Sequence, residues 1–210
     1  MPETQPATGA SEIGAHPLSR LRHTVQAMTR LCAQTLDEPA LLTEAQALMG
    51  QLVAHDDWLP EPMAQPHPAF YRQYLLHADP LARFSIVSFV WGPGQQTPVH
   101  DHTVWGIIGM LRGAEFSQRY QADASTGALH PAGAEHRLQP GDLETVSPTL
   151  GDIHRVRNAY DDRVSISIHM YGGNIGEVRR HVFDTVSGKA KPFVSGYCNS
   201  TVPNLWGPTA

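Results

Sequence analysis

The sequence predicts a mainly β fold, a small antiparallel β-barrel of the jelly-roll type preceded by a helical segment. Three observations indicate this fold. Apolar residues before residue 55 recur at helical spacing, and short runs rich in Val, Ile, Phe and Trp follow residue 70. The chain also contains 18 Gly and 17 Pro, a number of turn formers that suits many short strands. With 210 residues, the chain is long enough for one sizeable core but short for two, so we expect one structural unit.

Composition excludes several classes of function. The formal net charge is -5, so the chain lacks the basic field that binds nucleic acid or an anionic membrane surface. It contains no apolar run of 18 residues, and its first ten residues lack the layout of a signal peptide, so we expect a cytoplasmic protein. Cys32 and Cys198 form no C-x-x-C pair and indicate neither a disulfide framework nor a thiolate zinc site.

The first part of the chain divides into a lead, two helices and a connector. Residues 1–17 are polar and Pro-rich and are predicted to be a disordered lead. Residues 18–55 are predicted to form two helices that pack on the barrel, separated at Asp37-Glu38-Pro39, which favours a new helix start. The first apolar stripe is expected to extend from Leu18 to Leu36. Residues 56–69 contain four prolines and are interpreted as an extended connector.

Residues 70–185 are predicted to form the barrel. Its expected strands are residues 83–91, 104–112, 115–121, 136–138, 143–146, 154–158 and 163–171. Gly172-Gly173 is expected to end the last strand, which leaves residues 186–210 as a C-terminal tail of unassigned structure.

Histidine spacing predicts a metal site. On a strand, residues i and i+2 face the same side, so His100 and His102 would point into one interior. A bare H-x-H pair is more often structural, but here it lies in a G-x5-H-x-H-x3-G-x6-G pattern that ends at Gly113, and His154 follows about 40 residues later. These two segments resemble the two motifs of the cupin superfamily, a small β-barrel whose interior histidines bind a metal.

The resemblance departs from the usual cupin pattern at one position. Cupin sites generally add a Glu from the first motif, and Gly106 occupies that position here. The resemblance therefore leaves a three-nitrogen site of His100, His102 and His154, which suits Zn, Cu, Fe or Ni. Because no carboxylate neutralises the ion, an anionic ligand such as a thiolate substrate is expected.

Alternation along residues 165–171 predicts a second functional feature. Ser167, His169 and Tyr171 would share one face of a strand, with Ile166, Ile168 and Met170 on the other. A surface strand with its polar face outward would show the same alternation. Beside the three histidines, we favour a relay of hydrogen bonds that faces the cavity.

Together these motifs resemble the cysteine dioxygenase family of thiol dioxygenases over most of residues 70–185. The residues that show the resemblance are Pro98-Val99-His100-Asp101-His102-Thr103, Gly109-Met110-Leu111-Arg112-Gly113, His154-Arg155-Val156-Arg157-Asn158 and the set Ser167, His169 and Tyr171. The resemblance implies one Fe(II) per chain, O2 as co-substrate, and oxidation of a small thiol to its sulfinic acid. It also implies that Tyr171, His169 and Ser167 are the catalytic residues.

Two departures from the cysteine-specific members bear on the substrate. The cysteine that is crosslinked to the tyrosine in mammalian members aligns with Gly106-Ile107, which offers no thiol. The arginine that pairs with the substrate carboxylate aligns with Gln73, in a segment that begins at Tyr71. This pattern is similar to the bacterial 3-mercaptopropionate dioxygenases, in which an arginine at the position of Arg180 serves the site. The resemblance thus implies Gln73, Arg180 and Tyr71 as substrate-binding residues, with 3-mercaptopropionate favoured and L-cysteine next.

Two other functions remain open at this stage. A cupin isomerase or hydrolase would use the metal to polarise a carbonyl or a water, and a non-catalytic cupin would only sense a ligand. The relay favours the dioxygenase, because a sensor needs no Ser, His and Tyr directed at a metal. The expected partner is a small thiol carboxylic acid, with no nucleic acid and no membrane; the sequence does not indicate an oligomeric state.

Overall fold

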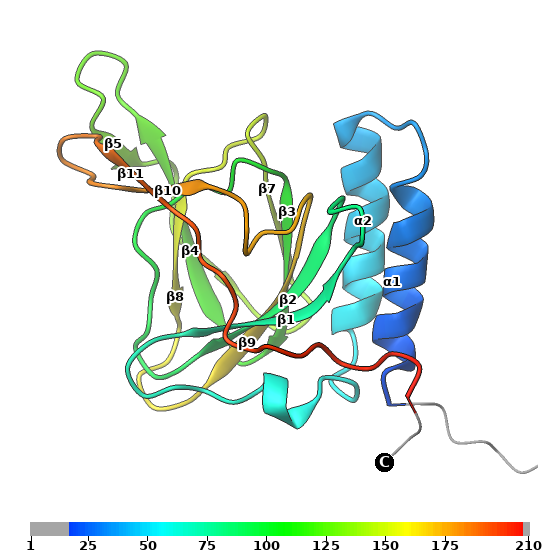
Figure 1. Ribbon diagram of the computed structural model, residues 1–210. Helices are drawn as coiled ribbons and strands as arrows, with labels where there is room; N and C mark the ends of the chain where they lie inside the picture. Colours follow the sequence, from blue (N-terminus) through cyan, green and yellow to red (C-terminus); the bar gives the residue numbers. More distant parts are fainter. Residues whose placement is uncertain (1–16, 208–210) are drawn as a thin grey trace, which may run out of the picture.

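A computed structural model describes residues 17–207, and its mainly β architecture confirms the predicted fold class (Figure 1). Two antiparallel sheets form the barrel, and two helices cover the outer face of one of them. The predicted disordered lead lies outside the described residues apart from Pro17. No helix among residues 17–207 is long and apolar enough to cross a bilayer.

The two helices begin and end where local chemistry favours it. Helix α1 spans Ser19–Leu31 and helix α2 spans Glu38–Val53. The Asp37 side chain accepts a hydrogen bond from the backbone N–H of Ala40, which caps α2, and Pro39 occupies its first turn. The predicted stripe was too long at its end, because α1 ends at Leu31, five residues before Leu36, which is 37% exposed in the link between the helices.

A five-stranded sheet forms the wall beside the helices. Its order is β1-β2-β9-β3-β7, with all neighbours antiparallel. The strands are β1 Arg72–Ala78, β2 Ser85–Trp91, β3 Gly106–Arg112, β7 Leu143–Val146 and β9 Ser165–Tyr171. Strand β1 lies inside the predicted barrel range but was not expected as an element. The connector before it contains one 3-10 turn, η1, at Glu61–Met63.

The opposite wall is built around β4, which pairs with three other strands. Its members are β4 Glu115–Ala122, β5 Leu129–Pro131, β6 His136–Leu138 and β8 His154–Asn158. Strands β6 and β8 have the predicted bounds, because turn residues flank each of them.

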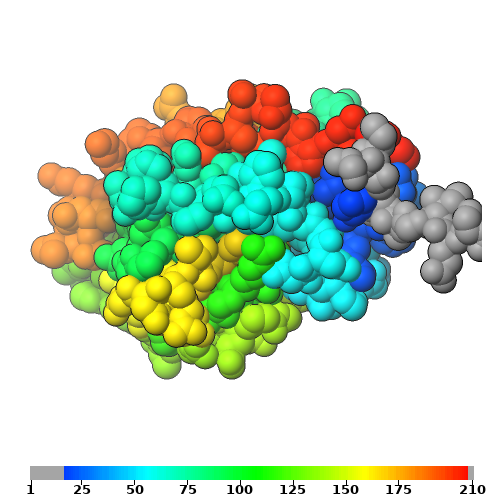
Figure 2. All heavy atoms as spheres, turned by 90° about the horizontal axis from the view of Figure 1, so that it is seen from below, coloured from blue at the N-terminus to red at the C-terminus, as the bar shows by residue number. Residues whose placement is uncertain are grey.

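Two further strands correct the expectation that Gly172-Gly173 ends the β structure. Strands β10, Arg180–Phe183, and β11, Ala190–Phe193, form an antiparallel pair. Val182 of β10 forms a bridge with His100, so the pair closes one end of the barrel. The chain after β11 then crosses the surface beside β1, where the Cys198 N–H donates to the Gln73 carbonyl. Figure 2 shows this segment in red as a continuous band along the molecule.

Strand β9 separates two apolar clusters. Its Ile166, Ile168 and Met170 are buried in the larger cluster with the helices. Tyr171 belongs to the smaller cluster inside the barrel, together with Phe89 and Trp91. The alternation of β9 therefore directs its apolar face to the helices and its polar face to the barrel interior.

Candidate metal centre and substrate pocket

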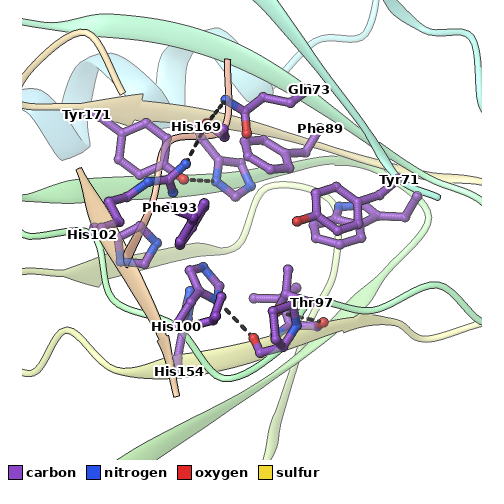
Figure 3. A pocket seen from close by; sticks show the side chains of 16 residues that line it. Tyr71, Gln73, Phe89, Thr97, His100, His102, His154, His169, Tyr171 and Phe193 are labelled. Atoms are coloured by element: carbon purple, nitrogen blue, oxygen red, sulfur yellow. Dashed lines mark hydrogen bonds between the residues drawn. The ribbon is translucent and has the colours of Figure 1, made fainter. Parts of the chain in front are cut away.

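The barrel interior holds a cavity of about 280 Å³ with polar groups from several elements (Figure 3). Eight of the nine predicted site residues line it, together with aromatic side chains, and Ser167 is the one that does not. The cavity has the size of a small molecule rather than a polymer. We call His100, His102 and His154 the histidine wall, and Arg180, Gln73 and Ser195 the arginine wall.

The three imidazoles of the histidine wall face one another. Their ring centroids are separated by 4.9 Å in each of the three pairs, and one nitrogen from each ring lies within 4.8 Å of the others. All three residues are buried. Such a triangle of nitrogen donors fits a divalent ion of the first transition series.

A loop and a bridge position these rings, which corrects the expectation of a regular strand. His100 forms an isolated bridge with His154, and His102 follows in a loop where Thr103 has a φ of 59°. The Asp152 carboxylate holds that loop by accepting hydrogen bonds from the backbone N–H groups of His102 and Thr103. The side chains still converge, because the bridge aligns the loop with β8.

The second nitrogen of each ring has its own partner. His100 Nδ1 lies 3.0 Å from the Pro98 carbonyl oxygen, and His102 Nδ1 lies 2.8 Å from Asp152 Oδ1. Ser117 Oγ lies 3.3 Å from His154 Nδ1. The Nε2 atoms are therefore left for a metal, oriented by partners of the kind that metal-binding histidines use.

Burial keeps His100 and His154 neutral. Loss of hydration, together with the neighbouring His102, lowers the pKa of His100 to about 3. Burial likewise holds the pKa of His154 well below its ordinary value. Neutral imidazoles at pH 7 present lone pairs, so the residues fit a bound cation.

Gly106 accounts for the absence of a carboxylate ligand. A Cβ atom at this position would lie 2.9 Å from the Tyr171 ring and 3.1 Å from Val146. Since Gly106 is also the register partner of Tyr171, a larger side chain would displace the tyrosine. The missing Glu and the position of Tyr171 are thus two consequences of one packing arrangement.

The predicted relay is continuous. Ser167 Oγ lies 2.9 Å from His169 Nε2, and His169 Nδ1 lies 2.8 Å from the Tyr171 hydroxyl. The Tyr171 ring stacks on His102 with centroids 5.5 Å apart, so its hydroxyl group reaches the cavity from beside the histidine wall. Burial raises the pKa of Tyr171, and the phenol remains protonated. The alternative of an outward polar face is wrong, because all three residues are buried.

Arg180 is the main charged group of the arginine wall. Its side chain is 3% exposed, which rules out a solvated surface cation. Its NH2 group donates to Ser195 Oγ at 2.7 Å, and its guanidinium carbon lies 4.8 Å from the Phe193 ring centroid. Within residues 17–207 no carboxylate forms an ion pair with it, and its Nε has no hydrogen-bond partner. A buried cation without a counter-ion favours an anionic ligand.

Gln73 and Tyr71 lie on the same side of the cavity. Gln73 Nε2 donates to Ser195 Oγ and to the Gly196 carbonyl at 3.0 Å each, so the C-terminal segment already uses its amide N–H groups. The Tyr71 ring lies 4.9 Å from Trp91 and lines the cavity. Arg72 points elsewhere, with its guanidinium carbon 5.8 Å from the Tyr74 ring centroid.

Three contributors were missed from the sequence. Ser195 and Phe193 lie within residues 186–210, for which the sequence predicts no defined structure, and no local pattern marks them. Asp101 lies between His100 and His102, in what we call the ligand loop, and no role was predicted for it. Its Oδ2 lies 2.8 Å from His181 Nδ1 and its Oδ1 accepts a hydrogen bond from the His181 backbone N–H, which connects β10 to the ligand loop. The position of this aspartate between two predicted metal ligands was the sequence signal that could have indicated its role.

Comparison with known proteins identifies one matching family and several structures that are similar at low identity. The family model for cysteine dioxygenase type I matches residues 67–184, more than half of the chain. A conserved protein with a double-stranded β-helix domain from Klebsiella pneumoniae is 15% identical, with a TM-score of 0.42 over 64% of this chain and 87% of that chain. A cupin superfamily protein from Desulfitobacterium hafniense is 14% identical, with a TM-score of 0.40 over 55% of this chain and 92% of that chain. The family match, with the two antiparallel sheets, confirms the predicted cupin-type barrel.

Proposed function

Because the chain belongs to the cysteine dioxygenase type I family, we propose that it is an Fe(II)-dependent dioxygenase that oxidises a small thiol carboxylic acid, preferably 3-mercaptopropionate, to its sulfinic acid. The observation that favours an acid substrate is the buried, unpaired Arg180 in the same cavity as three convergent imidazoles. A small thiol acid offers one anionic group for each wall.

The proposed reaction balances without another reductant. In R–SH + O2 → R–SO2H, two S–O bonds form, the O–O bond breaks, and the sulfur loses the four electrons that O2 gains. His100, His102 and His154 would hold the iron. When bound, Fe(II) would supply a Lewis acid that favours the thiolate form of the substrate and a redox centre for O2.

The residues of the chain then have separate tasks. Arg180 would bind the substrate carboxylate through charge-assisted hydrogen bonds, which orients the thiol toward the histidine wall. Gln73 would hold the Ser195 side chain and the Gly196 backbone in place, and Tyr71 would cover the apolar part of the substrate. Tyr171 would donate its O–H to the reacting oxygen atoms, oriented by His169 and Ser167.

The proposed iron centre can be tested by oxygen uptake and isotope labelling. Fe(II)-loaded protein is mixed with 3-mercaptopropionate under labelled O2, and the product is examined by mass spectrometry. We expect one O2 consumed per thiol and both labelled atoms in the sulfinate. A protein that consumes no O2 with any thiol acid would instead be an isomerase, a hydrolase or a sensor.

A further inference from the structure

The relay continues beyond Ser167 to a buried carboxyl group. Glu115 on β4 is fully buried, and its Oε2 lies 2.9 Å from Ser167 Oγ. The chain of hydrogen bonds therefore has four members: Glu115, Ser167, His169 and Tyr171. Its outer end at Tyr171 faces the cavity, while its inner end is an ionisable group that does not line the cavity. The proposed reaction assigns no task to this carboxyl group.

The proton count at Ser167 limits the relay to two arrangements. A hydroxyl group has one proton to donate and two lone pairs that accept. The Trp91 indole N–H can only donate, and at 3.1 Å it occupies one lone pair of Ser167 Oγ. Ser167 must therefore donate to one of Glu115 and His169 and accept from the other.

The direction of the hydrogen bond between Ser167 and His169 determines the direction of the next one, between His169 and Tyr171. Burial holds the pKa of His169 well below its ordinary value, so the ring is neutral with one N–H and one bare nitrogen. If Nε2 carries the proton and donates to Ser167, Nδ1 must accept from Tyr171. If Nδ1 carries the proton, it donates to the Tyr171 oxygen and leaves the phenol proton free.

The state of Glu115 selects between these arrangements. An ionised Glu115 can only accept, so Ser167 donates to it and His169 Nε2 donates to Ser167. The Tyr171 hydroxyl then donates its only hydrogen bond to His169 Nδ1. A protonated Glu115 that donates to Ser167 reverses every bond, and the Tyr171 O–H then points to the cavity.

We propose that Glu115 is a positioning residue whose protonation sets the direction of the relay and so decides whether Tyr171 can donate a hydrogen bond to a ligand in the cavity. The use of that donor in the reaction rests on the proposed function, whereas the direction of the relay belongs to the protein alone.

The surroundings of Glu115 favour its protonated form at neutral pH. Burial, with a smaller contribution from the carboxylate of Glu144 on β7, raises the pKa of Glu115 to about 8 against the opposing effect of its hydrogen-bonding neighbours Ser167 and Trp91. Arg119 and His136 lie near Glu144 instead, 3.5 and 3.6 Å from its Oε1. The groups that face Glu115 from β2, β8 and β9 are neutral: Trp91, Asn158 and Ser167.

The unpartnered oxygen of Glu115 indicates which oxygen carries the proton. Its Oε1 has no hydrogen-bond partner. A hydroxyl group at Oε1 would be a buried orphan donor, which is costlier than an orphan carbonyl oxygen. The proton therefore belongs on Oε2, from which it can be donated to Ser167.

The direct test is the tautomer of His169, read by long-range nitrogen–proton NMR on full-length protein labelled at histidine. The protein is loaded with Zn²⁺, a diamagnetic ion, and the His169 signal is assigned by its loss in His169→Gln. We expect the Nδ1–H form at pH 6 and a change to the Nε2–H form centred near pH 8. A wild-type ring that keeps one tautomer from about pH 6 to about pH 10 would overturn the proposal.

Glu115→Gln supplies the matched variant. Its amide N–H can donate to Ser167 at every pH, as the protonated acid does, so the Nδ1–H form should persist throughout. With iron and a thiol acid, wild-type turnover should fall roughly tenfold per pH unit above about pH 8, and the variant should not follow this decline. A variant that changes tautomer as the wild type does would contradict the proposal. The NMR result needs neither iron nor substrate, so it is independent of the proposed function; if the variant does not fold, the wild-type titration alone decides.

Discussion

The two walls of the cavity are held by different parts of the chain. The histidine wall comes from the ligand loop and β8, and each ring is fixed by a second partner on Pro98, Asp152 or Ser117. The arginine wall comes from β1, β10 and the segment after β11. The barrel itself thus supports the metal centre, whereas the segments that close it supply the group that would select the substrate.

This difference predicts different losses when each wall is disturbed. Changes in the histidine wall or the relay should affect metal content or turnover with every thiol. Changes in the arginine wall should affect acid substrates in particular and leave the metal in place.

The largest expected effect is that of His102→Ala. Removing one of three nitrogen ligands should abolish both metal retention and turnover, because two imidazoles without a carboxylate bind a divalent ion weakly. Metal per chain is measured by elemental analysis, with His130→Ala, an exposed histidine on β5, as the control. Full metal content and turnover in His102→Ala would show that the ligands are elsewhere.

Tyr171→Phe should have the next largest effect. We expect turnover to fall roughly 10- to 1000-fold if the phenol is a preorganised donor, with metal content unchanged. Tyr74→Phe is the matched control, because the Tyr74 hydroxyl donates to the Gln65 carbonyl on the other side of the sheet. Equal turnover in the wild type and Tyr171→Phe would reduce this tyrosine to a packing residue.

Arg180→Gln should act on the substrate rather than on the metal. Loss of a charged partner for a buried carboxylate costs about 1.5 to 3 kcal/mol, so kcat/KM for a thiol acid should fall roughly tenfold or more. Arg179→Gln changes the exposed neighbouring arginine and should have little effect. If the two variants behave alike, Arg180 does not bind the carboxylate.

The smallest expected effect is that of Ser195→Ala. Ser195 Oγ accepts hydrogen bonds from both Arg180 and Gln73, so its loss should loosen the arginine wall without removing its charge. We expect KM for a thiol acid to rise roughly three- to tenfold at constant metal content, in line with one lost hydrogen bond of about 1 kcal/mol. Steady-state kinetics measures both constants, and a fall in kcat with KM unchanged would contradict this role of Ser195.

The sequence allowed the strands, the helices and the pair His100 and His102 to be predicted from short-range signals, whereas His154 was added to the cluster by the resemblance to the second cupin motif. Alternation along β9 fixed which side chains share a face, and H-x-H spacing brought two rings together even though the backbone there is a loop. These patterns need only a few neighbouring residues.

The arginine wall could not be predicted in the same way. Strands β10 and β11 are short and half exposed, and Ser195 reaches Gln73 across 122 positions of sequence. Glu115 is similar, since a single acidic residue at the start of a strand gives no sign that it will be buried under Ser167. Contacts of this kind depend on the closed barrel, not on local spacing.

The most direct test of the account compares three thiols on Fe(II)-loaded enzyme: 3-mercaptopropionate, L-cysteine, and 2-mercaptoethylamine, which has no carboxylate. Sulfinate formation in air gives kcat/KM for each. If the histidine wall performs the reaction and Arg180 selects the acid, 3-mercaptopropionate should exceed L-cysteine, and the thiol without a carboxylate should be lowest by roughly tenfold or more. Preference for L-cysteine by tenfold would contradict the assigned substrate, and equal efficiency with 2-mercaptoethylamine would contradict the role of the arginine wall itself.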